Sequence, residues 1–450
     1  SLNERTGSEE FTKHLEAEFA SEFSGDGGVS RRHFMKIMGA SIALAGFTGC
    51  EWPEEEIIPF GKRPESYQPG RLRQYASTLE SGGVVRPVLV TSYDGRPIKI
   101  EGNPDHPLSG GATDLQGQAA ILDLYDPDRL RHVTRRHEGL TIRSSWEEFD
   151  RFLPAQMEGA TVQVVAEPSR SPSIARMRRR LSSRLADLEW AEFAIGELPA
   201  GRVGRDLAYG QPVDLDLDLR GVSCIADFGA DLLGMHPTAV RNARQFAEGR
   251  DPHHEMNRLW ALEPTWSVTG MAADHRFAVS EADLKRALFA LAHAIRDFGP
   301  LPHPEFLEGI PPVPGGNPSL DELAALAENL VSSAGRGVVV VGEKYSTQMH
   351  QLAAQINAAL GNRAATVRPR PAALFDVPRD RPGEGTPDLL VILGGDPVYQ
   401  SGGAVREDIE AAGCSIYIGP RANATSELCT WVLPETHALE EWGDAIGPDG

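Results

Sequence analysis

Leu389-Leu390-Val391-Ile392-Leu393-Gly394-Gly395-Asp396-Pro397 sets the fold class of this chain. The apolar run predicts a buried strand, and the glycines with the following Asp and Pro predict a tight turn before a helix near residues 405–411. The same order of buried strand, glycine turn and helix is present at residues 337–361. Repeated alternation of strands and helices predicts an α/β fold with doubly wound, mainly parallel sheets.

Outward from this stretch the alternation continues. Further apolar runs predict strands at residues 162–166, 222–226, 258–262, 415–418 and 431–433. Helices are predicted after Ser280 and Ser319, which resemble N-caps. Another helix carries a predicted apolar stripe of Ile174, Met177, Leu181 and Leu185, with Arg176, Arg178, Arg179, Arg180 and Arg184 on its other faces.

A small β unit is predicted nearer the N-terminus. Asp94-Gly95 joins two extended runs, residues 88–93 and 96–101. This dipeptide suits a type I′ hairpin turn, because both central positions of that turn need positive φ. A glycine-containing loop at residues 110–117 then opens a short helix that extends to Leu124.

These segments predict a domain order. We expect a leader at residues 1–50, a small hairpin-containing domain at 51–140, an α/β domain at 141–298, a Pro- and Gly-rich linker at 299–318, and a second, C-terminally truncated α/β domain at 319–450.

Composition excludes several functions. With 44 Lys and Arg against 64 Asp and Glu, the net charge is -20, which disfavours nucleic acid and anionic lipid and favours basic partners. The four cysteines, Cys50, Cys224, Cys414 and Cys429, are too far apart in sequence for a Cys-x-x-Cys metal site.

The leader has the pattern of an export signal. Arg31-Arg32, within residues 30–36, form a twin-arginine pair followed by an uncharged run at 37–48 that is too short to span a bilayer. Small residues before Cys50 resemble a lipoprotein processing site, so both an acylated and an unmodified Cys50 are open.

Several residues are candidates for chemistry, each with a structural alternative. The backbone at Gly342-Glu343 and at Gly394-Gly395-Asp396-Pro397 could meet a phosphate or simply form tight turns. Asp227, Asp231, Asp274 and His275 are either acid–base groups or helix caps. His437 with Glu440 or Glu441 could bind a metal at helical spacing or form surface hydrogen bonds.

The order of segments resembles the molybdopterin oxidoreductases. The matching segments are residues 94–96, 101–107, 125–130, 145–149, 394–397 and 433–436. The resemblance implies domains I to III of the formate dehydrogenase and DMSO reductase fold. In catalytic members, the loop matching residues 111–117 carries a cluster-ligating cysteine and a lysine, where this chain has Asp114 and Gln116. A single carboxylate does not replace the thiolates of an iron–sulfur cluster.

This departure resembles a narrower group, the Tat-exported molybdopterin-like B subunit of alternative complex III, a quinol:cytochrome c or high-potential acceptor oxidoreductase. Segments similar to that group are residues 30–36, 40–46, 49–50, 102–107, 123–129, 269–276 and 429–444. The resemblance implies a body that has lost molybdopterin, so that Gly342, Gly394, Gly395 and Asp396 are vestigial and neither cofactor nor metal is held.

The resemblance also implies a place and partners. We expect a scaffold-like, non-catalytic subunit on the periplasmic face of the cytoplasmic membrane, with a lipid anchor if Cys50 is acylated. Expected partners are an iron–sulfur protein or following region, cytochrome c subunits and quinol-binding membrane subunits. A truncated chain and a split gene both explain the missing C-terminal region, and an active molybdopterin-dependent oxidoreductase and an exported small-molecule-binding protein are the alternative functions.

Overall fold

The computed structural model describes residues 68–193, 199–298, 300–310, 316–372, 385–401 and 404–450. The chain divides into one unit ending at Gln68 and a second unit from Pro69 to Gly450, and all that follows concerns the second. Arg31, Arg32 and Cys50 lie outside the described residues, so the predicted leader is not tested. Within the described ranges, no helix combines the length and the apolar character that a bilayer crossing requires.

The predicted hairpin is present as part of a three-stranded antiparallel sheet. Its strands are β1 (Leu72–Ser81), β2 (Val84–Tyr93) and β3 (Arg96–Gly102). Asp94 and Gly95 have φ of 48° and 87°, as a type I′ turn requires. A second two-residue turn, Gly82-Gly83, joins β1 to β2 and also has positive φ. Helix α4 (Leu115–Leu124) packs on the small core of this sheet.

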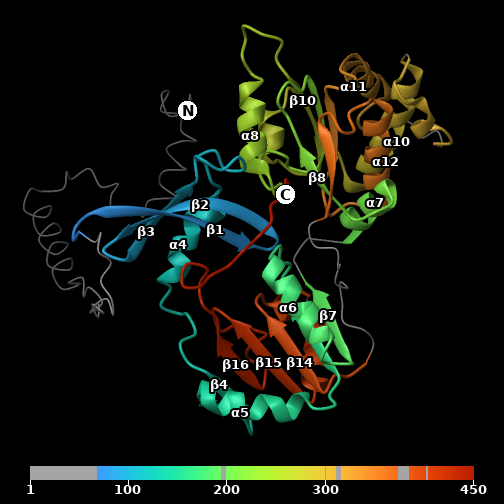
Figure 1. The fold of residues 1–450 in the computed structure, drawn as a ribbon. Helices are drawn as coiled ribbons and strands as arrows, with labels where there is room; N and C mark the ends of the chain where they lie inside the picture. The colour runs from blue at the N-terminus through green and yellow to red at the C-terminus, as the bar shows by residue number, and fades with distance from the viewer. Residues whose placement is uncertain (1–67, 194–198, 299, 311–315, 373–384, 402–403) are drawn as a thin grey trace, which may run out of the picture. The chain divides into compact units, whose positions relative to one another are not determined.

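A second sheet has four parallel strands in the order β11-β10-β9-β12, of which β10 is labelled in Figure 1. Their bounds are β9 (Cys224–Phe228), β10 (Arg258–Glu263), β11 (His275–Ala278) and β12 (Gly337–Val341). Successive residues of β12 enter different cores, with Val338 and Val340 on one face and Val339 and Val341 on the other. This alternation shows that both faces of the sheet are covered.

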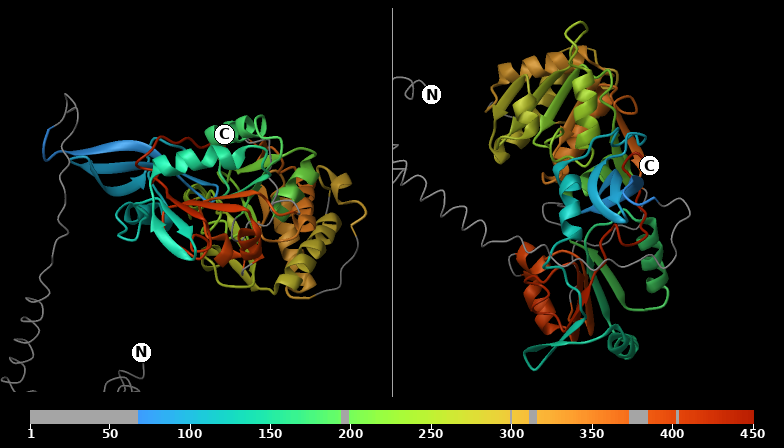
Figure 2. Two further views of the ribbon diagram at one scale, coloured as in Figure 1. Left: turned by 90° about the horizontal axis from the view of Figure 1, so that it is seen from below. Right: turned by 90° about the vertical axis from the view of Figure 1, so that its left-hand side faces the viewer.

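Helices cover one face of the four-stranded sheet, as Figure 2 shows for the yellow and orange segments. These are α10 (Glu281–Asp297), α11 (Leu320–Ser332) and α12 (Thr347–Ala359), with η2 (Pro304–Leu307) and α7 (Pro199–Tyr209) against α12. The other face packs on α8 (Ala239–Glu248) and on an antiparallel pair, β8 (Val213–Leu217) and β13 (Val367–Pro371). The short helix α9 (Val268–Ala272) follows β10. The predicted caps are confirmed: Ser280 accepts from Asp283 N, and Ser319 forms a full capping box with Glu322.

The third sheet has seven strands in the order β5-β4-β16-β15-β14-β6-β7. They are β4 (Thr134–His137), β5 (Leu140–Arg143), β6 (Val162–Ala166), β7 (Leu188–Glu192), β14 (Leu389–Leu393), β15 (Cys414–Gly419) and β16 (Trp431–Pro434). All pairs from β16 to β7 are parallel, and β4 and β5 add an antiparallel edge. Helix α5 (Trp146–Met157) packs on one face, and α13 (Pro397–Gln400) and α14 (Ala404–Ala411) on the other.

The strands are not divided between the sheets as two consecutive α/β domains, the arrangement that we expected, would require. Strands from both sides of residues 299–318 share each large sheet, because β12 pairs with β9 and β14 pairs with β6. Five-residue apolar runs predict that a strand is buried, but they are too alike to specify which strand lies beside it.

Helix α6 (Pro172–Ser182) contains most of the predicted apolar stripe. Of the predicted apolar stripe, Ile174 is 43% exposed and Met177 is 59% exposed, whereas Ala175 is buried. The apolar spacing predicted the helix correctly, but the adjacent core covers only part of its apolar side.

Trp431 provides a test of the seven-stranded core. It is fully buried and contacts the rings of Phe149 and Phe152 at centroid distances of 5.3 and 5.2 Å. Trp431→Ala should lower the free energy of unfolding by about 3–5 kcal/mol, because a large cavity would replace the indole. Urea unfolding followed by circular dichroism measures this loss.

The matched control is Trp442→Ala, since Trp442 is fully exposed. It should change the free energy of unfolding by less than about 0.5 kcal/mol. Equal losses for the two variants would contradict this account of the core.

Candidate functional site

Asp114 has two structural roles in the loop that precedes α4. It is the N-cap of α4, where its carboxylate accepts a hydrogen bond of 2.8 Å from the backbone N–H of Gly117. Both carboxylate oxygens also lie 2.8 Å from Nε of Arg86 on β2. Arg86 donates further to Gln116 Oε1 at 2.5 Å. The two residues that stand in the cluster-loop position are therefore held together by one arginine.

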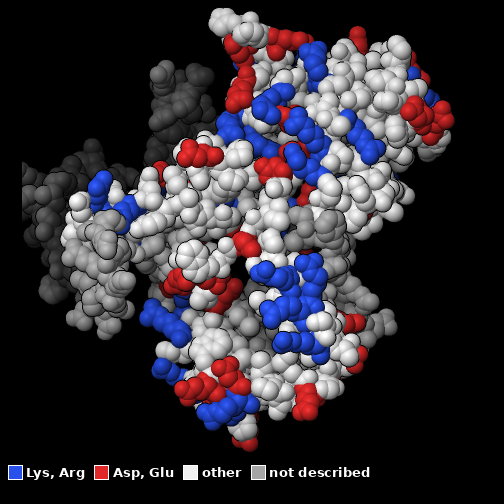
Figure 3. All heavy atoms as spheres, viewed as in Figure 1, with Lys and Arg blue, Asp and Glu red and all other residues white. Residues whose placement is uncertain are grey.

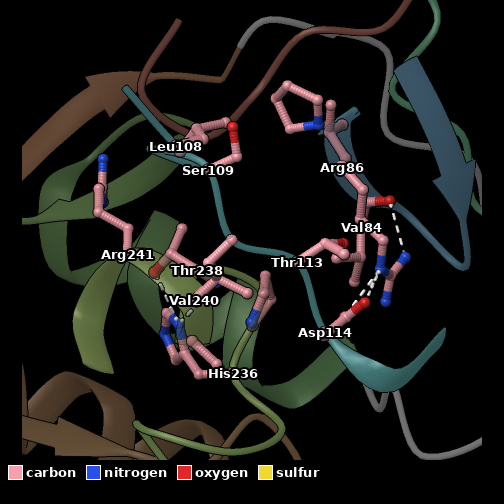
Figure 4. Close-up of a pocket in the computed structure, with 15 residues that line it drawn as sticks. Val84, Arg86, Leu108, Ser109, Thr113, Asp114, His236, Thr238, Val240 and Arg241 are labelled. Carbon is pink, nitrogen blue, oxygen red and sulfur yellow. Dashed lines mark hydrogen bonds and ion pairs between the residues drawn. The ribbon is translucent and has the colours of Figure 1, made fainter. Parts of the chain in front are cut away.

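A small pocket lies between this loop and the residues leading into α8 (Figure 4). Arg86 and Asp114 line one part of it, and His236 and Thr238 another. Burial lowers the pKa of His236 to about 4, so its imidazole is neutral at pH 7, and Nδ1 lies 2.9 Å from Thr238 Oγ1. The cavity volume of about 30 Å³ has room for one or two waters and not for a cluster or a pterin.

The turn after β12 is explained by close packing. A Cβ on Gly342 would lie 2.3 Å from the carbonyl oxygen of Gly229, in the turn after β9, so only glycine fits there. The next residue, Glu343, forms an ion pair with Arg205 on α7. Burial alone would raise the pKa of Glu343, but the nearby Arg205 and His350 outweigh it and lower the pKa.

Asp227 and Asp231 at the end of β9 act as loop anchors. Asp227 accepts from the backbone N–H groups of Ala230 and Leu232 at 2.7 and 3.0 Å. Burial raises the pKa of Asp227 to about 7. Asp231 accepts from Thr269 Oγ1 at 2.9 Å.

Asp274 and His275 are adjacent in sequence, but their side chains contact different partners. Asp274 binds Arg250 at 2.8 Å and accepts from Leu259 N at 2.8 Å. His275 stacks on Trp260 with ring centroids 3.9 Å apart. These contacts favour the structural interpretation of both residues over acid–base catalysis.

The glycine turn after β14 has the predicted conformation. Gly394 and Gly395 have φ of 73° and 65°. Asp396 is the N-cap of α13 and accepts from the backbone N–H groups of Ala424 and Thr425. The Asp396 side chain therefore fixes the loop after β15 to the turn, and this geometry does not itself show a ligand.

Glu167 lies over that turn, which the sequence interpretation missed. A Cβ on Gly394 or Gly395 would lie 3.3 or 3.2 Å from its carboxylate. Glu435, after β16, lies near Glu167: burial of its carboxylate, then the charges of Glu167 and Glu441, raise the pKa of Glu435 to about 7, although the residue as a whole is exposed. Glu167 directly follows a predicted strand and Glu435 comes two residues after another, but neither run indicates which strands lie side by side.

The metal interpretation of His437 with Glu440 or Glu441 loses its geometric basis. Residues 438–440 form a turn and not a helix. His437 Nε2 lies 3.1 Å from Ala120 O, Glu440 binds Arg129, and Glu441 accepts from Thr436. Within the described ranges, no three His, Cys, Asp or Glu side chains are grouped to hold a metal.

The described cysteines do not fit an iron–sulfur cluster. Cys224 is buried on β9, Cys414 on β15, and Cys429 precedes β16. Burial raises the pKa of Cys224 and Cys429 to about 12, which disfavours the thiolate that a metal needs.

Comparisons with known proteins agree with this fold. The chain is 23% identical over 467 residues to the menaquinone reductase, molybdopterin-binding-like subunit of Nitratidesulfovibrio vulgaris, covering 94% of this chain and 67% of the relative. It is 37% identical over 60 residues to the probable oxidoreductase YyaE of Bacillus subtilis, covering 13% of this chain and 9% of that protein. No family model matches the sequence.

Among solved structures, acetylene hydratase from Pelobacter acetylenicus superposes with a TM-score of 0.60 at 12% identity. The match covers 81% of this chain and 63% of that structure, so the chain spans less than two thirds of its length. The fold is that of the molybdopterin enzymes. The chain is a molybdopterin oxidoreductase-like protein.

Two substitutions of Asp114 separate its role as the N-cap of α4 from the role of its negative charge. Asp114→Ala removes the N-cap and the ion pair with Arg86, whose side chain is only 10% exposed, and should lower the free energy of unfolding by about 2 kcal/mol. Asp114→Asn, the matched control, keeps a capping acceptor and should cost about 1 kcal/mol. Urea unfolding measures both, and a larger loss for Asn than for Ala would contradict the capping role.

Asp227 predicts a pH dependence. The folded state holds its proton more tightly than the unfolded chain, so the stabilisation is full below pH about 4 and is lost as the pH rises through about 7. Asp227→Asn cannot titrate. Its free energy of unfolding relative to wild type should therefore rise between pH 4 and 7, as measured by urea unfolding at stepped pH. Parallel profiles for the two proteins would show that Asp227 keeps an ordinary pKa.

Proposed function

We propose that this chain is a non-catalytic, scaffold-like subunit of a membrane-associated respiratory oxidoreductase. The similarity over 94% of the chain to a protein named as a menaquinone reductase subunit supports a respiratory assembly. More narrowly, we propose a quinol:cytochrome c or high-potential acceptor oxidoreductase, alternative complex III, in which this chain supports an iron–sulfur electron-transfer partner. The narrower assignment rests on the sequence resemblance.

The observation that carries the non-catalytic role is the Arg86–Asp114 pair. In the resembled enzymes this loop supplies a cluster ligand, and here its carboxylate is already bound by an arginine and a helix N-terminus. A carboxylate in that state is a poor competitor for metal, because binding metal would give up a charge-assisted hydrogen bond and the cap. The residues of this loop do not fit a cluster.

The glycine turn after β14 supports the same conclusion for a dinucleotide cofactor. A pyrophosphate approaching Gly394 and Gly395 would meet the carboxylate of Glu167, with Glu435 beside it. Phosphate sites instead offer unpaired backbone N–H groups and positive charge. The residues at this edge do not fit the pyrophosphate of a molybdopterin dinucleotide, and we derive no chemical step through one.

The setting of the subunit is part of the proposal. Arg31-Arg32 would direct Tat export, and Cys50 would carry a lipid anchor at the periplasmic face of the cytoplasmic membrane. The proposed partners are an iron–sulfur protein, cytochrome c subunits and quinol-binding membrane subunits. The charge of -20 argues against nucleic acid.

Metal and pterin content tests the proposal. The protein purified with its partners from native membranes should contain molybdenum below about 0.1 atom per chain, and an oxidised extract should show no pterin fluorescence. Iron should be present in the assembly and absent from the separated chain, because the described residues offer no cluster site. Elemental analysis and electron paramagnetic resonance make these measurements.

A catalytic molybdenum enzyme purified in parallel is the control for cofactor loss during preparation. Glu167→Gln is the matched variant, since it removes the charge over the glycine turn without changing its shape. It should remain free of pterin, because Glu435 still lies beside the turn. Stoichiometric molybdenum in the native protein would establish the alternative, an active molybdopterin-dependent oxidoreductase.

A further inference from the structure

Helix α6 presents an unusual surface, here called the α6 surface and made of Ile174, Arg176, Met177, Arg180 and Arg184. All five side chains are exposed. Residues 168–186 contain six arginines and no Asp or Glu, within a chain of net charge -20. Figure 3 shows Lys and Arg side chains gathered over α6.

This surface does little for the stability of the helix. Arg176 and Arg180 follow one another at i, i+4 spacing, where like charges destabilise a helix by about 0.2–0.5 kcal/mol per pair, and Arg184 lies in the turn directly after the helix. Ile174 and Met177 leave apolar area in water beside them. The N-terminal end of α6 is held separately, because Asp444 accepts from Ser171 and Ser173. Local folding therefore does not explain the α6 surface.

We propose that the α6 surface binds a carboxylate-rich surface of another polypeptide in the same assembly. Ile174 and Met177 form the apolar centre of the contact, and the three arginines pair with carboxylates around it. Arg and Met are enriched at protein interfaces, and guanidinium groups bind carboxylates with two parallel hydrogen bonds. The proposed function enters only in naming the assembly, since the surface itself is defined by α6.

Charge distribution favours a protein partner over a lipid surface. An anionic bilayer is extended, so it would meet the acidic remainder of the chain as well as α6 and would be repelled by it. Two apolar side chains on an 11-residue helix also give little area for insertion. An acidic patch on a protein can match the three exposed arginines of the α6 surface alone.

Photo-crosslinking tests the occupant directly. Met177 is replaced by a benzophenone amino acid, and the full assembly is irradiated in native membranes. The expected adduct joins position 177 to an Asp- and Glu-rich peptide of a different polypeptide, identified by mass spectrometry. Adducts to lipid alone, to this chain's own leader or a second copy, or to nothing, would each overturn the proposal.

A charge variant supplies the second measurement. Arg176→Gln, Met177→Ser and Arg180→Gln together should reduce the fraction of the chain that co-sediments with the assembly at least ten-fold, and added NaCl should weaken wild-type assembly in the same direction. The matched control is Arg336→Gln with Arg406→Gln, whose side chains are 52% and 49% exposed elsewhere. It should assemble as wild type does.

Unfolding followed by circular dichroism shows whether the triple variant is folded. Because the variant changes only exposed side chains, it should unfold at the wild-type midpoint. Wild-type assembly of the triple variant would overturn the proposal. So would binding of the purified chain to phosphatidylglycerol vesicles that the triple variant loses. Molybdenum in the native protein would contradict the proposed scaffold function but would not change the crosslinking result. Failure of the proposed function and failure of the proposed contact are therefore distinguishable.

Discussion

The parallel pairing of β6 with β14 is the contact on which the rest of the structure depends. Val162 faces Leu389 in this pair, and Thr161 exchanges hydrogen bonds with Asp388 at its start, across 227 residues. The Asp388 carboxylate accepts from both the amide and the hydroxyl of Thr161, at 2.9 and 2.8 Å. A slip of one residue would turn every side chain of a buried strand to the wrong face. The hydrogen bonds between Thr161 and Asp388 therefore fix the register of the seven-stranded sheet.

That register determines the chemistry of one sheet edge. Because β6, β14 and β16 run in the same direction, Glu167, Gly394 and Glu435 follow their carboxyl ends at a common edge. Doubly wound folds use this edge for ligands. Here the edge carries carboxylates where a phosphate would need positive charge, and the Asp114 loop carries an ion pair where a cluster would need thiolates.

The sequence predicted the strands and helices themselves better than it predicted which strands lie side by side. Strands at residues 162–166, 337–341 and 389–393 have the predicted bounds, because these predominantly apolar runs are each followed directly by Gly or Glu. Strand β4 was missed because Thr134–His137 contains no apolar residue, and β8 was missed although Val213, Leu215 and Leu217 alternate with Asp as in a half-buried strand. The Glu167 and Glu435 pair depends on strand order, which no local pattern encodes.

The β6–β14 closure has a kinetic consequence. Strands β6 and β7 leave the ribosome long before β14 to β16 exist, so β6 can pair with β7 on one side while its other side has no partner until β14 has been made. Such high contact order slows folding and leaves an unpaired hydrophobic edge open to aggregation in the meantime. Newly synthesised chains should therefore depend on chaperone protection over this interval, and the intervening four-stranded domain, whose strands are nearer in sequence, has time to fold first.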